Sequence, residues 1–227
     1  MGSLKEKLRQ IQFLQVLRHP YVHIARSNEQ RKCQKELIKL ENKAPTLFSN
    51  DCIAGVLMKN YQLPCKSPMI NCAMYPDDYV QYLKNIEHYM KCELVEKESE
   101  LMFPVGELVS ELGNIEIRFQ HYSSFKEAQS LWKRRTKRID LDNMNVILDL
   151  NPYMIASKET IETFLELPYN KVIITTDAYR DTKCSHYINL GKKTMIKGIM
   201  LKYKNLRGYR YYDDFDFIGW LNNNAKV

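Results

Sequence analysis

The sequence predicts an α/β domain built around a mainly parallel sheet flanked by helices, with a helical N-terminal extension. Two apolar runs, "NVILDL" (145–150) and "KVIITTD" (171–177), are rich in Val and Ile, as strands buried on both faces are. Segments with helical periodicity separate the predicted strands. This alternation favours parallel pairing, because parallel neighbours are joined by crossover connections that are usually helices.

The composition is that of an ordinary globular chain. The 227 residues are enough for one large domain, and 44% are hydrophobic while 27% are charged. No run of about 18 apolar residues could span a bilayer, and no secretory signal pattern opens the chain. The six scattered cysteines include no Cys-x-x-Cys pair, which argues against a zinc site and a disulfide scaffold. We therefore expect a cytoplasmic protein without a metal site.

The chain divides into a basic helical extension, residues 1–44, and an α/β domain, residues 45–227. Residues 1–43 hold ten Lys or Arg and four Asp or Glu, and so carry nearly all of the net charge of +7. Such a segment packs on the body, or it binds a membrane surface or a protein partner. Nucleic acid is not an expected partner, because the basic residues lack interleaved glycines and regularly spaced aromatic residues.

Two helices are predicted in the extension. Leu and Ile at three- and four-residue steps predict an amphipathic helix over 4–18, which Pro20 ends. Ser27 and Gln30 form a capping box that predicts the start of a second helix, extending to about Asn42.

The first half of the domain begins with a short apolar strand after Pro45. In chain order we expect a strand over 45–48, a helix over 53–59, a strand over 69–74 and a helix from Pro76 to Met90. Proline at a helix start and carboxylates in its first turn are common capping features. Asp77 and Asp78 are therefore interpreted as caps and not as catalysts.

In the second half, an alternating strand over 114–122 places His121 on the same face as three apolar residues. Ser123 or Ser124 caps a helix over 125–139, and Ser157 caps a helix that extends to Leu165. The strands over 145–150 and 171–177 complete the predicted sheet. The tail over 211–223 is interpreted as an aromatic-rich helix or turn.

The carboxyl ends of the predicted strands carry reactive side chains. Ligands of parallel sheets gather outside these ends. The residues expected there are Ser49, Asn50, Asp51 and Cys52 after the first strand, His121 after the alternating strand, and Asp149 and Asp177 after the last two. A thiol, an imidazole and carboxylates at one edge indicate nucleophilic or acid–base catalysis.

Cys52 is the candidate nucleophile. It precedes a predicted helix, where the dipole and free N–H groups lower the pKa of a thiol and hold anions. Gly55 would let a ligand approach closely. The alternative is that Cys52 is a buried thiol in an ordinary bend, since Ser-Asn-Asp favours turns. His121 is either the base that activates Cys52 or a core histidine bonded to the backbone.

A basic run on the helix after Trp132 offers Arg134 and Arg138 as ligands for the phosphates of a donor, or simply forms a solvated face. The following Asp140-Leu141-Asp142 is superficially similar to the Asp-x-Asp of metal-dependent glycosyltransferases, in which two carboxylates hold a divalent cation. A turn before a strand is the alternative interpretation, because three-residue matches occur often by chance.

Six sequence blocks resemble a bacterial family of unknown function whose members are commonly labelled exopolysaccharide or capsular polysaccharide biosynthesis proteins. The resemblance covers about residues 45–223, in order. The blocks are "FSNDCIAG", "LPCKSPMINCAMYPDDYVQYLKNIEHYM", "FPVGEL", "IEIRFQHYSSFKEAQSLWKRRTKRIDLDNMNVI", "LPYNKVIITTDAY" and "RGYRYYDDFDFIGWLN". The resemblance implies a role in surface-polysaccharide synthesis.

This chain departs from the family pattern at three places. Members typically read Ser-Asn-Asn-Cys-Trp-Gly-Gly over positions 49–55, whereas Asp51, Ile53 and Ala54 stand here. They also read Asn-Trp-Asp-Asn where 140–143 is Asp-Leu-Asp-Asn, and an Asp-Arg-Asp-Gly-like stretch where Leu-Asn-Pro follows Asp149. A shorter likeness, to polysaccharide acetyltransferases with Asn-Cys at the head of a helix, implies that the thiol accepts or orients an acyl group.

Three functions are therefore expected. The first is a transferase acting on a sugar or polysaccharide precursor, cytoplasmic or peripheral at the inner face of the membrane. It would use acyl-coenzyme A as donor, with Cys52 as nucleophile, His121 as base and Asp149 as a third catalytic residue. The second is a glycosyltransferase that binds a nucleotide sugar through Asp142, Asp149 or Asp177 together with Arg134 and Arg138. The third is a non-catalytic binding or scaffold protein of the polysaccharide machinery.

Overall fold

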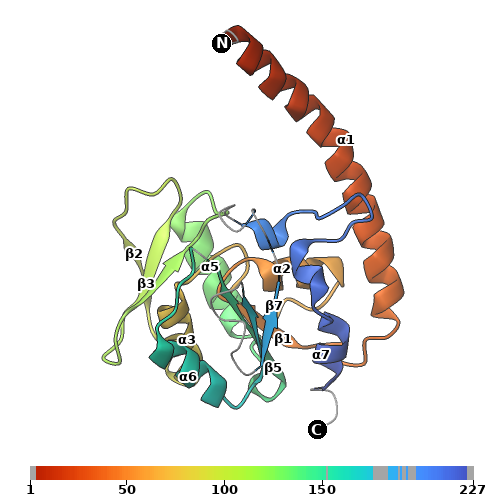
Figure 1. Ribbon diagram of the computed structural model, residues 1–227. Helices are drawn as coiled ribbons and strands as arrows, with labels where there is room; N and C mark the ends of the chain where they lie inside the picture. The colour runs from red at the N-terminus through yellow and green to blue at the C-terminus, as the bar shows by residue number, and fades with distance from the viewer. Residues whose placement is uncertain are drawn as a thin grey trace.

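The computed structural model describes residues 4–151, 153–175, 184–188, 190, 193 and 198–223, and gives residues 4–19 as backbone only (Figure 1). The α-helices are α1 (Leu4–Leu37), α2 (Ile53–Asn60), α3 (Pro76–Lys84), α4 (Ile86–Tyr89), α5 (Phe125–Thr136), α6 (Lys158–Glu166) and α7 (Phe217–Asn223). The strands are β1 (Thr46–Ser49), β2 (Leu94–Lys97), β3 (Val105–Leu108), β4 (Ile115–Arg118), β5 (Met144–Leu150), β6 (Asn170–Thr175) and β7 (Ser185–Tyr187). Short 3-10 helices are η1 (Leu141–Asn143), η4 (Ile199–Leu201) and η5 (Tyr211–Asp214).

The strands form two sheets, so the fold is mixed α/β with a parallel sheet at its centre. The four-stranded sheet has the order β1-β5-β6-β7 and all of its pairs are parallel. The other sheet, β2-β3-β4, is antiparallel. The expectation that the alternating strand joins the parallel sheet is therefore wrong. A short turn links β3 to β4, and such a connection permits only antiparallel pairing.

The central sheet is covered on both faces. All seven residues of β5 are buried, which is why its sequence is apolar at every position except Asn145 and Asp149. On one face, Val146 and Leu148 pack in a core shared with α3, α5, α6 and the antiparallel sheet. On the other, Ile147 and Ile174 pack in a core shared with the end of α1, α2 and α7. The carboxyl ends of three strands are buried as well, since Ser49, Leu150 and Thr175 are each 0% exposed.

Helix α1 is one continuous helix, so the predicted break at Pro20 and the predicted capping box at Ser27 are wrong. A proline removes only one backbone hydrogen bond, and this cost does not break α1, whose part after Pro20 packs on the body. The first part of α1 extends beyond the body and its second part lies along it (Figure 1). Among the residues that the structure describes, no helix is both long and apolar enough to cross a membrane.

Buried charges fix the second part of α1 to the C-terminal segment. Arg210 Nε donates to Glu29 Oε1 at 2.6 Å, and Tyr203 donates to Glu29 Oε2 at 2.7 Å. Lys32 pairs with Asp213 at 2.7 Å. Glu29 is only 2% exposed, and leaving such a charge without its partner costs about 3–5 kcal/mol. This part of the extension is thus bound to the domain, while the boundary at residue 44 stays a prediction.

Several local predictions can be checked along the chain. The capping serines Ser124 and Ser157 are confirmed, since each accepts a hydrogen bond from the first turn of its helix. The predicted helix over 76–90 is interrupted at Asn85. The stretch over 69–74 is not a strand and makes a single bridge from Ala73 to Arg118.

Asp77 and Asp78 stand in the first turn of α3 after Pro76, as expected, but no side chain forms a capping hydrogen bond there. Asp78 accepts a hydrogen bond from the backbone N–H of Glu116 at 3.2 Å, and Asp77 accepts one from the hydroxyl of Thr160. Both carboxylates therefore bind neighbouring elements. The two interpretations of the tail are both partly right, because η5 is followed by α7.

Candidate functional site

The bend between β1 and α2 is held by its own side chains. The hydroxyl of Ser49 donates to the carbonyl of Asp51 at 2.7 Å and accepts from the N–H of Ala54 at 3.0 Å. The side-chain amide of Asn50 donates to the carbonyl of Asp149 at 3.0 Å and accepts from its N–H at 2.7 Å. Asn50 thereby extends the pairing of β1 with β5 by one residue. Ser49 and Asn50 position this edge, and their predicted role in substrate binding is untested.

This bend brings two carboxyl groups together at the carboxyl ends of neighbouring strands. Asp149, on β5, is 2% exposed, and its Oδ2 accepts a hydrogen bond from Asn151 at 3.1 Å. Its Oδ1 is buried and receives no hydrogen bond from any N–H or hydroxyl among the described residues. The carboxyl of Asp51, which follows β1, lies close enough to that of Asp149 for the two groups to interact directly. Two ionised carboxylates at such close approach repel each other, so we infer that the pair shares one proton.

Burial and the close approach of the two carboxyl groups set the electrostatics of this pair. Burial raises the pKa of Asp149 well above its ordinary value, and the charge of Asp51 raises it further. Burial also raises the pKa of Asp51, although the hydrogen bond from the N–H of Ile53, 3.0 Å long, partly offsets the effect. The pair therefore holds a proton at a pH where isolated aspartates are ionised. A carboxyl group tuned in this way is suited to accept and return a proton near neutral pH.

Tyr79, on α3, lies close to the same pair and was not predicted as a site residue. Its hydroxyl is buried and is one of the few described polar groups without a hydrogen-bond partner. Its pKa is raised well above the ordinary value, first by burial and then by the charge of Asp51. The apolar stripe of α3 gave no signal for a site role, because a tyrosine at that spacing is indistinguishable from a core residue.

Cys52 lies immediately before α2 and is half-buried. Its pKa is raised to about 12, first by burial and then by the charge of Asp51. This direction is opposite to the lowering expected at a helix start. The helix dipole is opposed here by a neighbouring carboxylate and by loss of solvent, so the thiol is neutral at physiological pH. At Gly55, the neighbour is Ile70 of the chain itself: a Cβ added to Gly55 would lie 3.6 Å from the side chain of Ile70.

We expect Cys52 to react slowly with thiol reagents. Alkylation by iodoacetamide at pH 7.5, followed by peptide mass spectrometry, should label Cys52 at least about tenfold more slowly than exposed Cys184, because only the thiolate reacts. Asp51→Asn should accelerate the labelling of Cys52 by removing the nearby negative charge. Faster labelling of Cys52 than of Cys184 in the unmodified chain would show that its thiol is activated after all.

His121 lies in the turn that follows β4, and its side chain is exposed. The interpretation as a core histidine is therefore wrong, because β4 ends at Arg118 and the alternation does not continue. The backbone N–H of His121 donates to the carbonyl of Asn71 at 3.3 Å. In the described part of the chain, no hydrogen bond or ion pair joins its ring to Cys52. The predicted pairing of this imidazole with Cys52 is untested.

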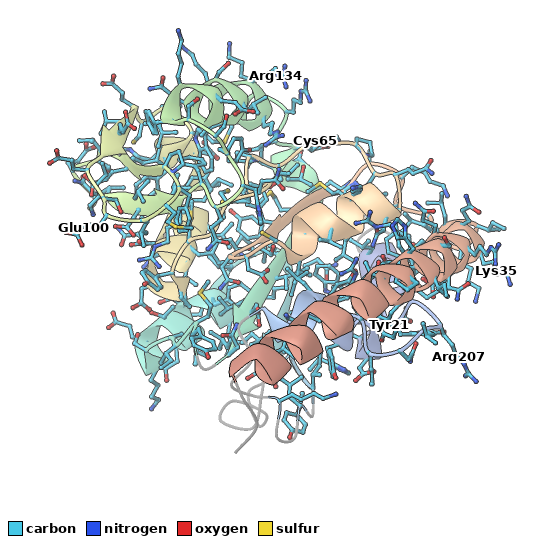
Figure 2. All side chains as sticks on the ribbon, turned by 90° about the horizontal axis from the view of Figure 1, so that it is seen from above. Tyr21, Lys35, Cys65, Glu100, Arg134 and Arg207 are labelled. Atoms are coloured by element: carbon cyan, nitrogen blue, oxygen red, sulfur yellow. The ribbon has the colours of Figure 1, made fainter. Side chains whose placement is uncertain are left out.

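The residues predicted for a nucleotide sugar do not gather at one edge. Asp142 lies in η1, just before β5, whereas Asp149 lies near the end of that strand, about 20 Å away at the usual rise per residue. Arg134 and Arg138 are exposed near the end of α5, which leads into η1. Figure 2 shows Arg134 pointing outward from α5. Asp177 lies outside the described residues.

The contacts of Asp140, two residues before Asp142, show that this segment lies at the amino ends of the strands. The N–H of Asp140 donates to the hydroxyl of Thr46, the first residue of β1, at 3.0 Å. Asp140 also pairs with Lys66 at 2.9 Å. Across the described ranges, no group of three His, Cys, Asp or Glu side chains is arranged to hold a metal ion.

Comparison with known proteins identifies the family. Residues 23–222 match the family described as a domain of unknown function, DUF1919. The chain belongs to the DUF1919 family. A relative from Haemophilus influenzae (strain Rd), described as an uncharacterized protein, is 33% identical over 186 residues, which is 82% of this chain and 87% of the relative. The expected membership of a bacterial family of unknown function is confirmed, and the polysaccharide label, which neither description carries, stays a prediction.

Proposed function

We propose that this DUF1919 protein is an acyltransferase that modifies a sugar hydroxyl during synthesis of a bacterial surface polysaccharide. One observation carries the proposal: the carboxyl groups of Asp51 and Asp149, which we infer to share a proton, lie next to each other at the carboxyl edge of the parallel sheet, where such folds bind ligands. The half-buried Asp51 and Cys52 connect the buried Asp149 to the surface. The polysaccharide and the cytoplasmic location are supported by the sequence blocks and by the scattered spacing of the six cysteines.

In the proposed reaction, the carboxyl pair serves first as base and then as acid. The pair takes the proton of the sugar hydroxyl while the oxygen attacks the carbonyl carbon of an acyl thioester. The C–S bond then breaks, and the leaving thiolate receives the proton from the pair. The products are an O-acyl sugar and a free thiol, and the pair returns to its initial state.

The electrostatics favour direct acyl transfer over transfer through the Cys52 thiol and over glycosyl transfer from a nucleotide sugar. A raised pKa makes Cys52 a poor nucleophile at physiological pH, so transfer is direct and forms no acyl-cysteine. The diphosphate of a nucleotide sugar would meet two carboxyl groups at this edge, and like charges repel. An acyl-coenzyme A also carries a diphosphate, but this group lies at the far end of the pantetheine arm, so the thioester carbon can reach the pair without bringing that charge beside it.

A ligand screen on the full chain tests the class of donor. We expect acetyl-coenzyme A to raise the melting temperature, because a ligand at 100 times its Kd adds about 2.7 kcal/mol of stability. Asp149→Asn should retain this stabilisation, since the substitution removes the base and leaves the donor site. Stabilisation by nucleotide sugars alone would overturn the proposal in favour of a glycosyltransferase. Stabilisation by neither class of donor would favour a non-catalytic protein.

Transfer itself is then measured by mass spectrometry of oligosaccharide acceptors incubated with acetyl-coenzyme A. The unmodified chain and Cys52→Ser should both add acetyl groups, whereas Asp149→Asn should not. Loss of transfer in Cys52→Ser with persistence in Asp149→Asn would instead support the thiol as the reacting group.

A further inference from the structure

A hollow lies away from the carboxyl pair, between the turn from α4 to β2 and the last turns of α5. Its volume is about 460 Å³. The lining residues that matter here are Lys91, Glu93, Gln129, Trp132, Lys133 and Lys137. Since α5 leads into η1 and then into the start of β5, this hollow lies toward the amino ends of the strands. We call it the lysine hollow.

Three ammonium groups surround the lysine hollow without a counterion from the chain. Lys91, Lys133 and Lys137 are exposed, and within the described ranges none of their side chains forms an ion pair or a hydrogen bond. Lys133 and Lys137 are four residues apart, so they are neighbours on one face of α5 and repel each other. Glu93 is the single acidic residue of the lining. The field in the hollow is therefore positive and attracts anions.

The walls of the hollow combine polar and apolar side chains and expose little aromatic surface. Gln129 uses its amide to donate to the carbonyl of Leu94 at 2.7 Å, which fixes α5 against β2. Trp132 is the aromatic residue of the lining, and it is only 5% exposed because it packs against Tyr82 and Phe119. Single-stranded nucleic acids bind largely by stacking on exposed rings. A charged hollow without such a ring fits an anion that does not stack.

We propose that the lysine hollow binds an anionic saccharide chain through its carboxylate or phosphate groups. The inference that the ligand is a saccharide rests on the proposed function. The inference that it is an anion rests only on the lysine charges around the hollow. Arg134 and Arg138, exposed on the adjoining surface of α5, extend the positive surface for a longer chain. The hollow would hold a polymer at a distance from the carboxyl pair, so that binding there does not require the transfer reaction.

Fluorescence anisotropy with labelled oligosaccharides tests this site. The probes are an oligogalacturonate, an oligosaccharide joined by phosphodiesters, a neutral dextran and a single-stranded oligodeoxynucleotide of similar length. We expect saturable binding of one or both anionic saccharides, weakening as salt rises from about 20 to about 200 mM, because salt screens exposed charges. Dextran should not bind. The first two probes distinguish carboxylate from phosphate as the recognised group.

The matched variants remove equal charge from two places. Lys133→Gln with Lys137→Gln should weaken anionic saccharide binding about tenfold, since each exposed charge contact contributes modestly. Lys35→Gln with Lys59→Gln, on α1 and α2, should leave it unchanged. Equal effects of the two pairs, absence of binding at low salt, or tighter binding of the oligodeoxynucleotide would overturn the proposal. Asp149→Asn should bind the probes normally, so failure of the acyltransferase proposal alone is recognisable.

Discussion

Asp149→Asn should abolish acyl transfer and at the same time make the protein more stable at pH 8. Loss of a general acid–base group lowers turnover by about 10²–10⁴-fold. The stability gain arises because the substitution keeps the shape of the side chain and removes its charge. The new amide oxygen can still accept from Asn151, and the new NH₂ group can donate to Asp51 in place of the shared proton. Activity and stability thus move in opposite directions, which a merely structural aspartate would not produce.

The pH dependence follows from the raised pKa of Asp149. The folded state binds the proton of Asp149 more tightly than the unfolded state does. The contribution of this group to the free energy of unfolding is therefore fully present below the ordinary pKa of about 4. Stability falls as the pH rises from there through the raised pKa, by about 1.4 kcal/mol for each pH unit that separates the two pKa values. In a chain of this length, about 1 kcal/mol corresponds to about 2–4 °C in melting temperature. Asp149→Asn should therefore flatten the decline of melting temperature between pH 5 and pH 8.

The measurement is a series of thermal melts at constant ionic strength across this pH range, paired with the acyl transfer assay. Asp142→Asn is the matched control, because Asp142 is an exposed carboxylate before the same strand. It should change neither the slope nor the transfer rate. If Asp149→Asn lowered the melting temperature at every pH and left the slope unchanged, the carboxyl pair would not share a proton as inferred.

The parallel sheet could be predicted from the sequence because its signals are local. The run that forms β5 is mostly apolar, Ser157 marks the start of one helix, and Ser123 or Ser124 marks the start of another, for which the structure selects Ser124. The antiparallel sheet could not, because β2 and β3 are four residues each and one is largely exposed. The prediction of a break at Pro20 was wrong because helix propensity is a weak local term, which the rest of the structure overrides.

The candidate site was predictable as a set of residues but not as a geometry. Asp51 and Asp149 were both expected at strand ends, yet nothing in the sequence shows that β1 pairs with β5, so that Thr46 lies beside Met144. The pairing decides the chemistry, since the carboxyl of Asp51 raises the pKa of Asp149 and opposes a thiolate at Cys52. Tyr79 was missed because burial beside a carboxyl has no signature in a single sequence.

Gly208→Ala should release the second part of α1 from the body. Gly208 has a φ of +83°, and an added Cβ would lie 2.2 Å from the backbone nitrogen of Glu29 and 2.6 Å from the carbonyl oxygen of Ala25. Both clashes are with the helix backbone, which no side-chain rotation relieves. The loop carrying Gly208 is also fixed by a hydrogen bond of 2.7 Å from Asn28 to the carbonyl of Leu206. Figure 1 shows this loop alongside α1, so the methyl group must move either the loop or the helix.

The expected cost is large because movement there separates a buried ion pair. If α1 shifts, Glu29 loses Arg210, and breaking a buried pair of this kind costs about 3–5 kcal/mol. Gly198→Ala is the matched control, because Gly198 also has a positive φ, of +65°, but no atom lies within 4 Å of its added Cβ. That substitution should cost only about 1–2 kcal/mol of backbone strain.

Urea unfolding and limited proteolysis distinguish loss of contacts at the helix from general destabilisation. Gly208→Ala should lower the unfolding midpoint much more than Gly198→Ala, and should expose the chain around Ala25 to cleavage under native conditions. Equal midpoints for the two variants would mean that only the positive φ matters and that the loop does not press on the helix. Glu29→Gln should fall between them, because its amide still fills the space and accepts from Arg210 while the charge is lost. The order of the three variants therefore separates backbone contact, ion pair and strain as the forces that hold α1 on the domain.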